Sequence, residues 1–361
     1  MRSAKRVAVD TEADSLHHYF EKVCLIQVGI NGYNAVIDPL ADLNLEPFLH
    51  VLSTKRLIFH GGDYDLRMLR QSLGFRPKSE VFDTVLAAQV LGYERYSLSA
   101  LAEQLLDVTL SKKGQKSNWA RRPLTEPQLR YAADDTRYIE RIANLLEQQL
   151  AKLDRVTWHR EMCKRMVEAT ARDNDRDRSQ AWRIKGLGRM EPRELAFVRS
   201  LWHWRDREAR KVDRPAFKIM GNPLLIDLAV WAITHPDAPL TRGPKLPRDC
   251  RGQRLNALQK AIAEAHSLQP SQWPQPRKRH PTQEDPSGFR PRQTAMIAEC
   301  AKLASDLGIE PAILAPRAAL GAIARHRPTT IKDIMACGPL LHWQAKLLQP
   351  AIEKTLKDHP D

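Results

Sequence analysis

Residues 6–14 constrain the fold most strongly, because a short apolar run is followed at once by closely spaced acidic residues. The run Val7-Ala8-Val9 predicts a buried strand. Asp10 and Glu12 follow it, and in an extended strand side chains at positions i and i+2 point to the same face. Neighbouring carboxylates repel each other, so we expect positive charge between them, typically a divalent cation bound through oxygen. Taken alone, the pair fits an ordinary polar strand end better than a metal site. Further carboxylates at suitable positions are needed to favour a metal site.

The rest of residues 1–150 alternates between strand and helix patterns. Two apolar runs joined by the Asn31-Gly32 turn predict an antiparallel meander with the first strand. Strand and helix patterns then alternate, which predicts an α/β fold with a mixed sheet and flanking helices. The predicted strands are 23–29, 33–38, 56–60 and 79–83, and the predicted helices are 45–53, one from about 63, 84–92 and one from about 125 to 150.

Two further carboxylates fall on predicted helices. Asp65 lies in a first helical turn, where a carboxylate meets the positive end of the helix dipole. Tyr131 and Asp135 are spaced i, i+4 on a helix that begins with the capping box Thr125-x-x-Gln128, so they share one face. A hydroxyl one turn from a carboxylate could hold a water between them. The ordered set D-x-E, D, Y-x-x-x-D is far more specific than any of its members.

A basic segment with one interleaved tryptophan lies between these motifs. Five of its twelve residues carry positive charge, which predicts a loop that contacts phosphates and bases, with a solvated charged face as the alternative. The candidate nucleic-acid-binding residues are Lys112, Lys113, Lys116, Trp119, Arg121 and Arg122.

Charge is distributed unevenly along the chain. Residues 1–150 hold 19 basic and 19 acidic residues, so the whole net charge of +14 comes from the remaining 211 residues. A polyanion is the natural partner of such a chain, and a basic but merely soluble helical domain is the alternative.

Length and composition limit the class of protein. A chain of 361 residues predicts two or three domains. Its apolar runs are shorter than the roughly 20 residues that span a bilayer, and because a strand is predicted from about residue 6, we expect no secretory segment. The five cysteines are far apart and form no C-x-x-C pair, which fits a reducing cytoplasm rather than a disulfide or zinc framework.

Together the motifs of residues 5–150 resemble the DEDD superfamily of 3′→5′ exonucleases, in the subgroup with a tyrosine four residues before the last aspartate, and more closely the ribonuclease D family. The resemblance implies a ribonuclease H-like exonuclease domain. The matching stretches are Asp10-Thr-Glu12, Cys24-Leu-Ile-Gln-Val, His60-Gly-Gly-Asp-Tyr-Asp65-Leu, Phe82-Asp-Thr, Ser97-Leu-Ser-Ala-Leu, Ser117-Asn-Trp-Ala-Arg-Arg-Pro-Leu and Tyr131-Ala-Ala-Asp-Asp135.

The resemblance also implies a mechanism. Asp10, Glu12, Asp65 and Asp135 would hold two divalent cations, Mg²⁺ or Mn²⁺, and Tyr131 would orient the attacking water. The expected substrate is RNA with a free 3′ end, specifically a tRNA precursor, and the expected products are 5′-nucleoside monophosphates. A monomer is expected. Two rivals stay open, a DNA-directed 3′→5′ exonuclease with the same site and a non-catalytic RNA-binding protein.

The C-terminal 190 residues predict two helical blocks. Helices are expected at 192–212, 222–232 and 253–268, then a linker rich in Pro, Arg and His, then a helical block at 292–357. Both blocks carry a Pro-Ala loop before a helix and resemble HRDC domains, small helical bundles that imply an auxiliary RNA-binding role. The expected division is an exonuclease domain at 1–176, a first HRDC-like domain at 177–272, and a linker with a second HRDC-like domain at 273–361.

Overall fold

The computed structural model describes residues 1–110, 114, 116–171, 178–276 and 289–360. The chain forms two compact units. The first unit contains Met1–Ala13, Val23–Arg172 and Gln283–Asp361, and the second contains Asp14–Lys22 and Asp173–Thr282. Each unit therefore gathers segments that are distant in sequence.

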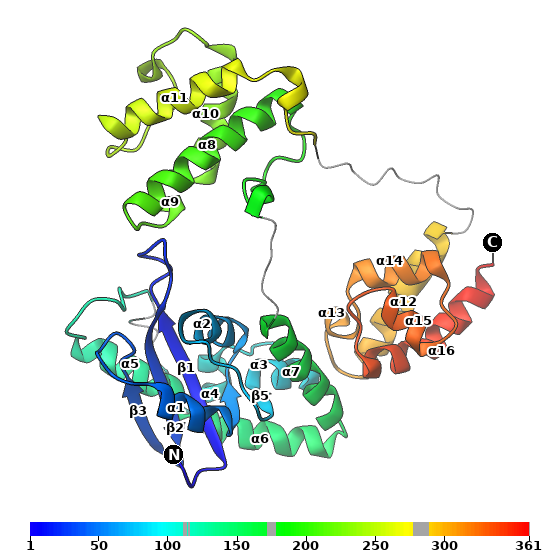
Figure 1. Ribbon diagram of the computed structural model, residues 1–361. Helices are drawn as coiled ribbons and strands as arrows, with labels where there is room; N and C mark the ends of the chain where they lie inside the picture. The colour runs from blue at the N-terminus through cyan, green and yellow to red at the C-terminus, as the bar shows by residue number, and fades with distance from the viewer. Residues whose placement is uncertain (111–113, 115, 172–177, 277–288, 361) are drawn as a thin grey trace. The chain divides into compact units, whose positions relative to one another are not determined.

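The first unit is built on a five-stranded sheet with the order β3-β2-β1-β4-β5 (Figure 1). β1 pairs antiparallel with β2, and β2 with β3, whereas β1 to β4 and β4 to β5 are parallel pairs. The predicted mixed sheet is thus confirmed. The strands are β1 Arg6–Ala13, β2 Val23–Ile30, β3 Tyr33–Ile37, β4 Arg56–Phe59 and β5 Val81–Asp83.

Alternation along β1 sorts its side chains between the two faces of the sheet. Val7 and Val9 pack in the cluster that includes residues of α1 and α2. Ala8 lies in the other cluster, with residues of α3 and α6. Asp10 and Glu12 share the parity of Ala8, so they continue its face beyond the apolar core.

Helices flank this sheet on both sides. They are α1 Glu46–Ser53, α2 Asp63–Leu73, α3 Thr84–Leu91, α4 Leu98–Leu106, α5 Glu126–Arg137, α6 Ile139–Lys152 and α7 Val156–Ala171. The single helix expected from about 125 to 150 is wrong in one respect, because the chain breaks it at Tyr138 into α5 and α6. The apolar spacing runs through both helices, and therefore gave no sign of the break.

A helical bundle at the end of the chain belongs to the same unit. It consists of α12 Phe289–Asp306, α13 Pro311–Leu314, α14 Arg317–His326, α15 Ile331–Ala336 and α16 His342–Asp358. Its apolar residues share one core with α3, α6 and α7. The guanidinium of Arg155 donates to the carbonyls of Val90 and Leu307, and the indoles of Trp158 and Trp343 stack. This bundle is therefore part of the hydrophobic core of the first unit.

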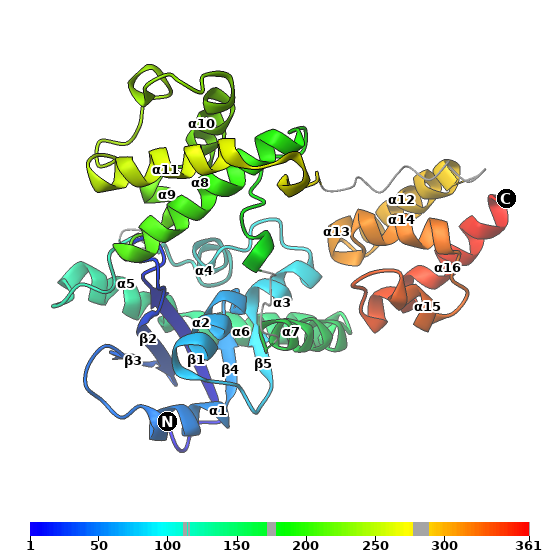
Figure 2. The ribbon, with the colours of Figure 1, turned by 45° about the horizontal axis from the view of Figure 1, so that its top comes forward.

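The second unit is a bundle of α8 Pro192–Lys211, α9 Ala216–Ile219, α10 Asn222–Thr234 and α11 Gln253–Ser267, seen from another side in Figure 2. Its core includes Phe197, Leu201 and Trp204, as expected from their helical spacing. The loop between β1 and β2 belongs to this unit, because His18 bonds to Asp213 and the Tyr19 hydroxyl donates to Asp206.

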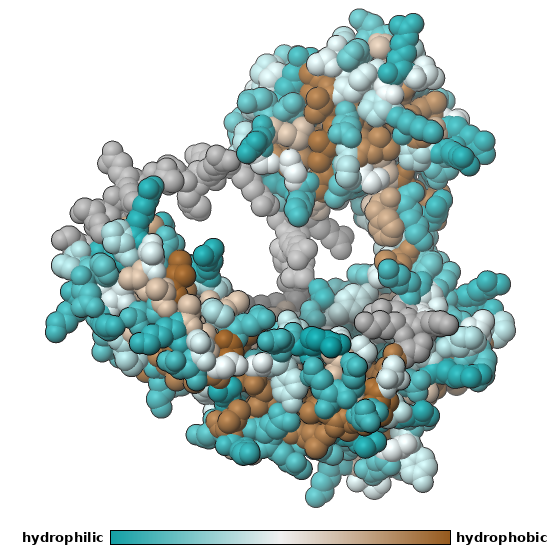
Figure 3. Space-filling model, turned by 180° about the vertical axis from the view of Figure 1, so that it is seen from behind, coloured by the Kyte–Doolittle hydropathy of each residue, from teal (hydrophilic) through white to brown (hydrophobic). Residues whose placement is uncertain are grey.

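The surface shows no membrane-spanning feature among the described helices. None of them is both long and apolar enough to cross a bilayer. Hydrophilic side chains occur over all of the face in Figure 3, with apolar patches between them.

Candidate active site

Three carboxylates converge where β1 passes the end of its parallel partner. β1 pairs with β4 only from Arg6 to Ala8, so Asp10 and Glu12 project beyond that pairing. α5 packs across β1, β2 and β3 and brings Asp135 to the same place. Ligand atoms of Asp10, Glu12 and Asp135 all lie within 4.8 Å of one another. Oxygen donors at this spacing fit a hard divalent cation.

Asp65 reaches the site from the first turn of α2 and is tied to β1. Its Oδ1 accepts hydrogen bonds from the Thr11 backbone N–H at 2.9 Å and the Thr11 hydroxyl at 2.6 Å. Thr11 lies between Asp10 and Glu12 but has the opposite parity, so it faces α2. One oxygen of Asp65 is thereby fixed by the strand that carries the other acidic residues. Asp65 remains outside the group of three that meets within 4.8 Å.

A tight turn between β4 and α2 positions Asp65. Gly61 has a φ of +74°, and a Cβ on Gly62 would come within 2.5 Å of the Phe59 side chain. The Asp83 carboxylate accepts a bond from the Gly62 N–H at 2.7 Å and also caps α3. Glycine at both positions and a buried aspartate behind them therefore set the start of α2.

Burial raises the pKa of all four carboxyl groups, and the charges of neighbouring site carboxylates add to this effect at Asp10, Glu12 and Asp135. The pKa of Asp10 rises well above its usual range, mainly through burial and then through the charges of Asp65, Asp135 and Glu12. Burial, with Asp135 and Asp65, raises the pKa of Glu12 to about 9. Burial raises the pKa of Asp65 to about 6 and that of Asp135 to about 7. A bound cation would stabilise the ionised forms, so this donor set fits a metal.

Tyr131 lies one helical turn before Asp135 on α5. Burial, followed by the charges of Asp135, Glu12 and Asp10, raises the pKa of the phenol. The hydroxyl is hydrogen-bonded to Asp135, whose pKa this bond lowers. The phenol therefore keeps its proton at neutral pH and serves as a donor, which suits orienting a water better than removing its proton.

The structure divides the six candidate RNA-binding residues into four groups. Lys112 and Lys113 lie outside the described residues, whereas Lys116 and Arg121 are exposed. Trp119 is only 1% exposed and packs with Cys24, Leu25 and Ala132, its ring centroid 6.0 Å from that of Tyr131. The expectation that this indole contacts bases is therefore corrected, because the ring supports the active-site helix from within the core.

Arg122 holds the same segment against the sheet. Its guanidinium donates to both carboxylate oxygens of Asp38 at 2.6 Å and to the Cys24 carbonyl at 2.9 Å. The Arg122 hydrogen bond is the main reason that the pKa of Asp38 is lowered. The guanidinium predicted to bind RNA is thus engaged in an ion pair with Asp38, and its contact with RNA stays a prediction.

Sequence reasoning missed the positioning residues around the carboxylates. No role was predicted for Thr11, although alternation along the strand places it on the face opposite to Asp10 and Glu12. The Asp83 bond to Gly62 joins residues 21 positions apart, and no local pattern indicates it. Asp134 behaves as expected, because it points away from the site and forms a salt bridge with Arg137 at 3.1 Å.

Comparison with known proteins gives both domains a family. A profile described as 3′-5′ exonuclease matches residues 1–151, and one described as HRDC domain matches residues 194–238. Ribonuclease D of Pseudomonas paraeruginosa is 32% identical over 278 residues, which cover 76% of this chain and 73% of that protein. Ribonuclease D of Xanthomonas oryzae pv. oryzae is 27% identical over 363 residues, 98% of this chain and 93% of that protein.

Solved structures share the fold. Escherichia coli RNase D is similar with a TM-score of 0.70 and 23% identity, covering 100% of this chain and 95% of that one. A Bifidobacterium adolescentis protein is similar with a TM-score of 0.80 and 22% identity, covering 99% and 93%.

A mixed sheet with carboxylates converging at its central strand, together with the profile match, defines a metal-dependent 3′→5′ exonuclease. The match extends past this domain into the helical part of the chain. The chain belongs to the ribonuclease D family and is a 3′→5′ exoribonuclease with an HRDC domain.

Proposed function

We propose that Asp10, Glu12, Asp65 and Asp135 hold two divalent cations, Mg²⁺ or Mn²⁺, and that this site hydrolyses RNA from its 3′ end. The convergence of Asp10, Glu12 and Asp135 within 4.8 Å carries the proposal. When bound, divalent cations neutralise the charge that develops on a transferring phosphate and lower the pKa of water. The raised carboxyl pKa values support the binding of cations. They indicate that the neighbouring groups of the protein do not compensate the negative charge of the ionised carboxylates.

Each side chain of the site has a separate task. Asp10, Glu12 and Asp135 face one point and act as ligands. Asp65 contributes from α2, with one oxygen held by Thr11. Tyr131 stays protonated, and its hydroxyl orients the attacking water beside Asp135. The products would be 5′-nucleoside monophosphates and an RNA shortened by one residue.

We infer that the substrate is a structured RNA with a free 3′ end, most simply a tRNA precursor. Escherichia coli RNase D is described as an exoribonuclease involved in structured RNA processing. The charge of this chain supports a polyanionic partner, since residues 151–361 carry all of the +14. Gly114 borders the site, because a Cβ on it would lie 3.0 Å from the Tyr131 ring. We propose that Lys112, Lys113 and the exposed residues Lys116 and Arg121 contact the RNA backbone.

We also propose that the chain works as three parts, 1–176, 177–272 and 273–361, with the third containing a second HRDC-like domain. The two bundles support this, since each has a long helix, a one-turn helix that begins within a Pro-Ala pair, and a following helix: α8, α9 and α10 in one, α12, α13 and α14 in the other. A monomer in the cytoplasm remains the prediction, and the five cysteines are free thiols in the structure.

The test is a 3′-tailed tRNA precursor incubated with the full-length protein and Mg²⁺. The wild type should shorten the tail stepwise, and Asp10→Ala or a chelator should abolish shortening. Asp134→Ala is the matched control, because it removes the neighbouring carboxylate that points away from the site. The same tail made of DNA should be degraded more slowly.

Two outcomes contradict the proposal. Binding without shortening under Mg²⁺ and Mn²⁺ would mean that the chain is an RNA-binding protein. Equal degradation of the RNA and DNA tails would mean that the site does not select ribose.

A further inference from the structure

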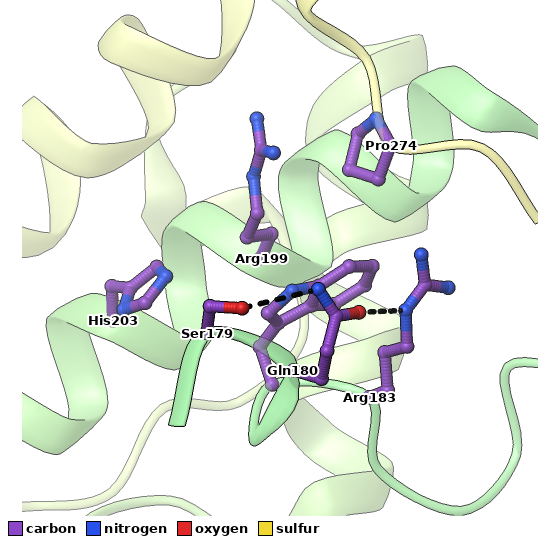
Figure 4. A pocket seen from close by; sticks show the side chains of 7 residues that line it. Ser179, Gln180, Arg183, Arg199, His203 and Pro274 are labelled. Carbon is purple, nitrogen blue, oxygen red and sulfur yellow. Dashed lines mark hydrogen bonds between the residues drawn. The ribbon is translucent and has the colours of Figure 1, made fainter. Parts of the chain in front are cut away.

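A hollow of about 470 Å³ lies on the HRDC-bearing unit, away from the carboxylates in sequence (Figure 4). It is formed where the segments before α8 and after α11 pass the middle of α8. We call it the α8 pocket, and its volume suits a nucleotide-sized ligand. The lining residues are Ser179, Gln180, Trp182, Arg183, Arg199, His203 and Pro274.

Two arginines line the α8 pocket and are restrained by hydrogen bonds. Arg183 donates from Nε to the Gln180 side chain at 2.6 Å, and its guanidinium lies 4.4 Å from the Trp182 ring centroid. Arg199 donates to the backbone carbonyl of Gln272 at 3.0 Å. This carbonyl restrains the Arg199 guanidinium without cancelling its charge. The pocket is thus organised before any ligand arrives.

Positive charge dominates this region. None of the seven described residues that line the pocket is acidic. Arg199, His203 and Arg207 follow one another at i, i+4 spacing along α8 and so share one face. The pKa of His203 is lowered, first by burial and then by the charges of Arg207 and Arg199. Residues 173–282 carry 22 basic and 12 acidic residues, so this unit holds most of the chain's positive excess.

We propose that the α8 pocket binds a phosphate-bearing nucleotide. Arg199 donates to the phosphate through its planar fork, and His203 adds a second donor one turn away. Trp182 is 2% exposed and forms an inner wall behind Arg183, and the buried Pro274 completes the apolar lining. The matched HRDC span, 194–238, excludes residues 179–183 and 274, so the pocket depends on flanking segments of this chain.

The nucleotide can come from two sources, the RNA chain or a free nucleoside monophosphate released by the nuclease. That the ligand is RNA rests on the proposed function, whereas binding of a phosphate group by the pocket does not. If the pocket binds the RNA backbone, it should raise the affinity of the protein for RNA and make that affinity fall more steeply with salt concentration. A pocket that takes the free nucleotide would bind the product instead.

The test measures binding of a fluorescent 12-nucleotide RNA by anisotropy. Full-length protein carries Asp10→Asn throughout, so the RNA stays intact and binding is read independently of catalysis. Adding Arg199→Gln should weaken binding about tenfold, as expected for losing a charge-assisted hydrogen bond, and lower the slope of log K against log salt by about one. His203→Ala should weaken binding in the same direction.

Arg193→Gln is the matched control, because it removes the same charge from an exposed position on the same helix and leaves the pocket intact. A thermal melt verifies that each variant folds. Adenosine monophosphate is added as competitor, and displacement of the RNA identifies the free nucleotide as the ligand, whereas no displacement identifies the RNA backbone. The proposal would be overturned if the Arg199→Gln and Arg193→Gln variants had equal affinities for the RNA and equal affinities for adenosine monophosphate. Wild-type cleavage of a dinucleotide, assayed separately, reports whether the nuclease proposal itself fails.

Discussion

The Thr11 hydroxyl donates a 2.6 Å hydrogen bond to Asp65 and so joins α2 to the strand that carries Asp10 and Glu12. The backbone N–H of Thr11 bonds to the same oxygen at 2.9 Å. These bonds lower the pKa of Asp65 against the effect of burial. Thr11 therefore keeps one carboxylate ionised and oriented without contacting the substrate.

Thr11→Val tests this positioning role. The substitution keeps the shape and removes the hydroxyl, so Asp65 loses one hydrogen bond and its pKa rises. We expect the Mg²⁺ concentration for half-maximal RNA cleavage to increase about tenfold, as for other groups that orient metal ligands. Thr54→Val, on an exposed helix end of the same unit, is the control. A change in maximal rate with an unchanged Mg²⁺ requirement would argue against positioning of a ligand.

The raised carboxyl pKa values predict how the metal-free protein responds to pH. An acid whose folded-state pKa exceeds its unfolded value stabilises the fold only while it is protonated, so stability is lost as pH rises through the folded-state pKa. With Asp65 near 6, Asp135 near 7 and Glu12 near 9, the Tm should fall between about pH 5 and pH 9. Melting curves in a chelator measure this fall.

Removing one carboxylate charge from the site or adding a cation should prevent this fall in Tm. Asp10→Asn is expected to raise the Tm of the metal-free protein at pH 8, although it abolishes activity. Saturating Mg²⁺ should restore the wild-type Tm at that pH, because it binds only the folded site. A Tm that is flat from pH 5 to pH 9 in chelator would contradict the repulsion described for this cluster.

Tyr131→Phe separates orientation of water from packing. The ring stays against Trp119 while the hydroxyl at Asp135 is lost. We expect kcat to fall about 100-fold with little change in the Mg²⁺ requirement, the size typical of a lost proton-handling or orienting group. Single-turnover cleavage measures the chemical step directly. Tyr138→Phe, at the break between α5 and α6, should keep wild-type kinetics.

Trp343→Ala tests the shared core of the first unit. Trp343 stacks on Trp158 with ring centroids 4.5 Å apart and planes 7° apart, and it is 4% exposed. Truncating a buried aromatic should cost about 3 kcal/mol of unfolding free energy. Urea denaturation followed by circular dichroism measures the loss. Phe217→Ala, at a residue 55% exposed, is the control and should change little.

Local pattern was sufficient for the elements and for the order of the acidic residues. Short apolar runs predicted β1, β2 and β4, and the Pro192 start of α8 follows from its sequence. The i, i+2 spacing of Asp10 and Glu12 also indicates that they share a face. These inferences hold because strand and helix periods are set within a few residues.

Contacts between distant segments could not be predicted in this way. Trp119 is surrounded by basic residues in sequence, yet its ring is buried against β2 and α5. Arg122 forms an ion pair with Asp38, which lies 84 positions away in the sequence. The loop after Glu12 joins the other compact unit through Asp206 and Asp213. Each of these contacts depends on tertiary packing, which no local periodicity of a single sequence indicates.

The common core of α12 to α16 with α3, α6 and α7 also sets an order of events during translation. Residues 1–172 leave the ribosome before any of the last bundle has been made. Until then side chains such as Leu91 and Trp158 lack part of their packing. A prematurely terminated chain would carry every acidic residue of the active site on a body whose core is incomplete. The core of the nuclease is thus complete only once α12 to α16 have been made.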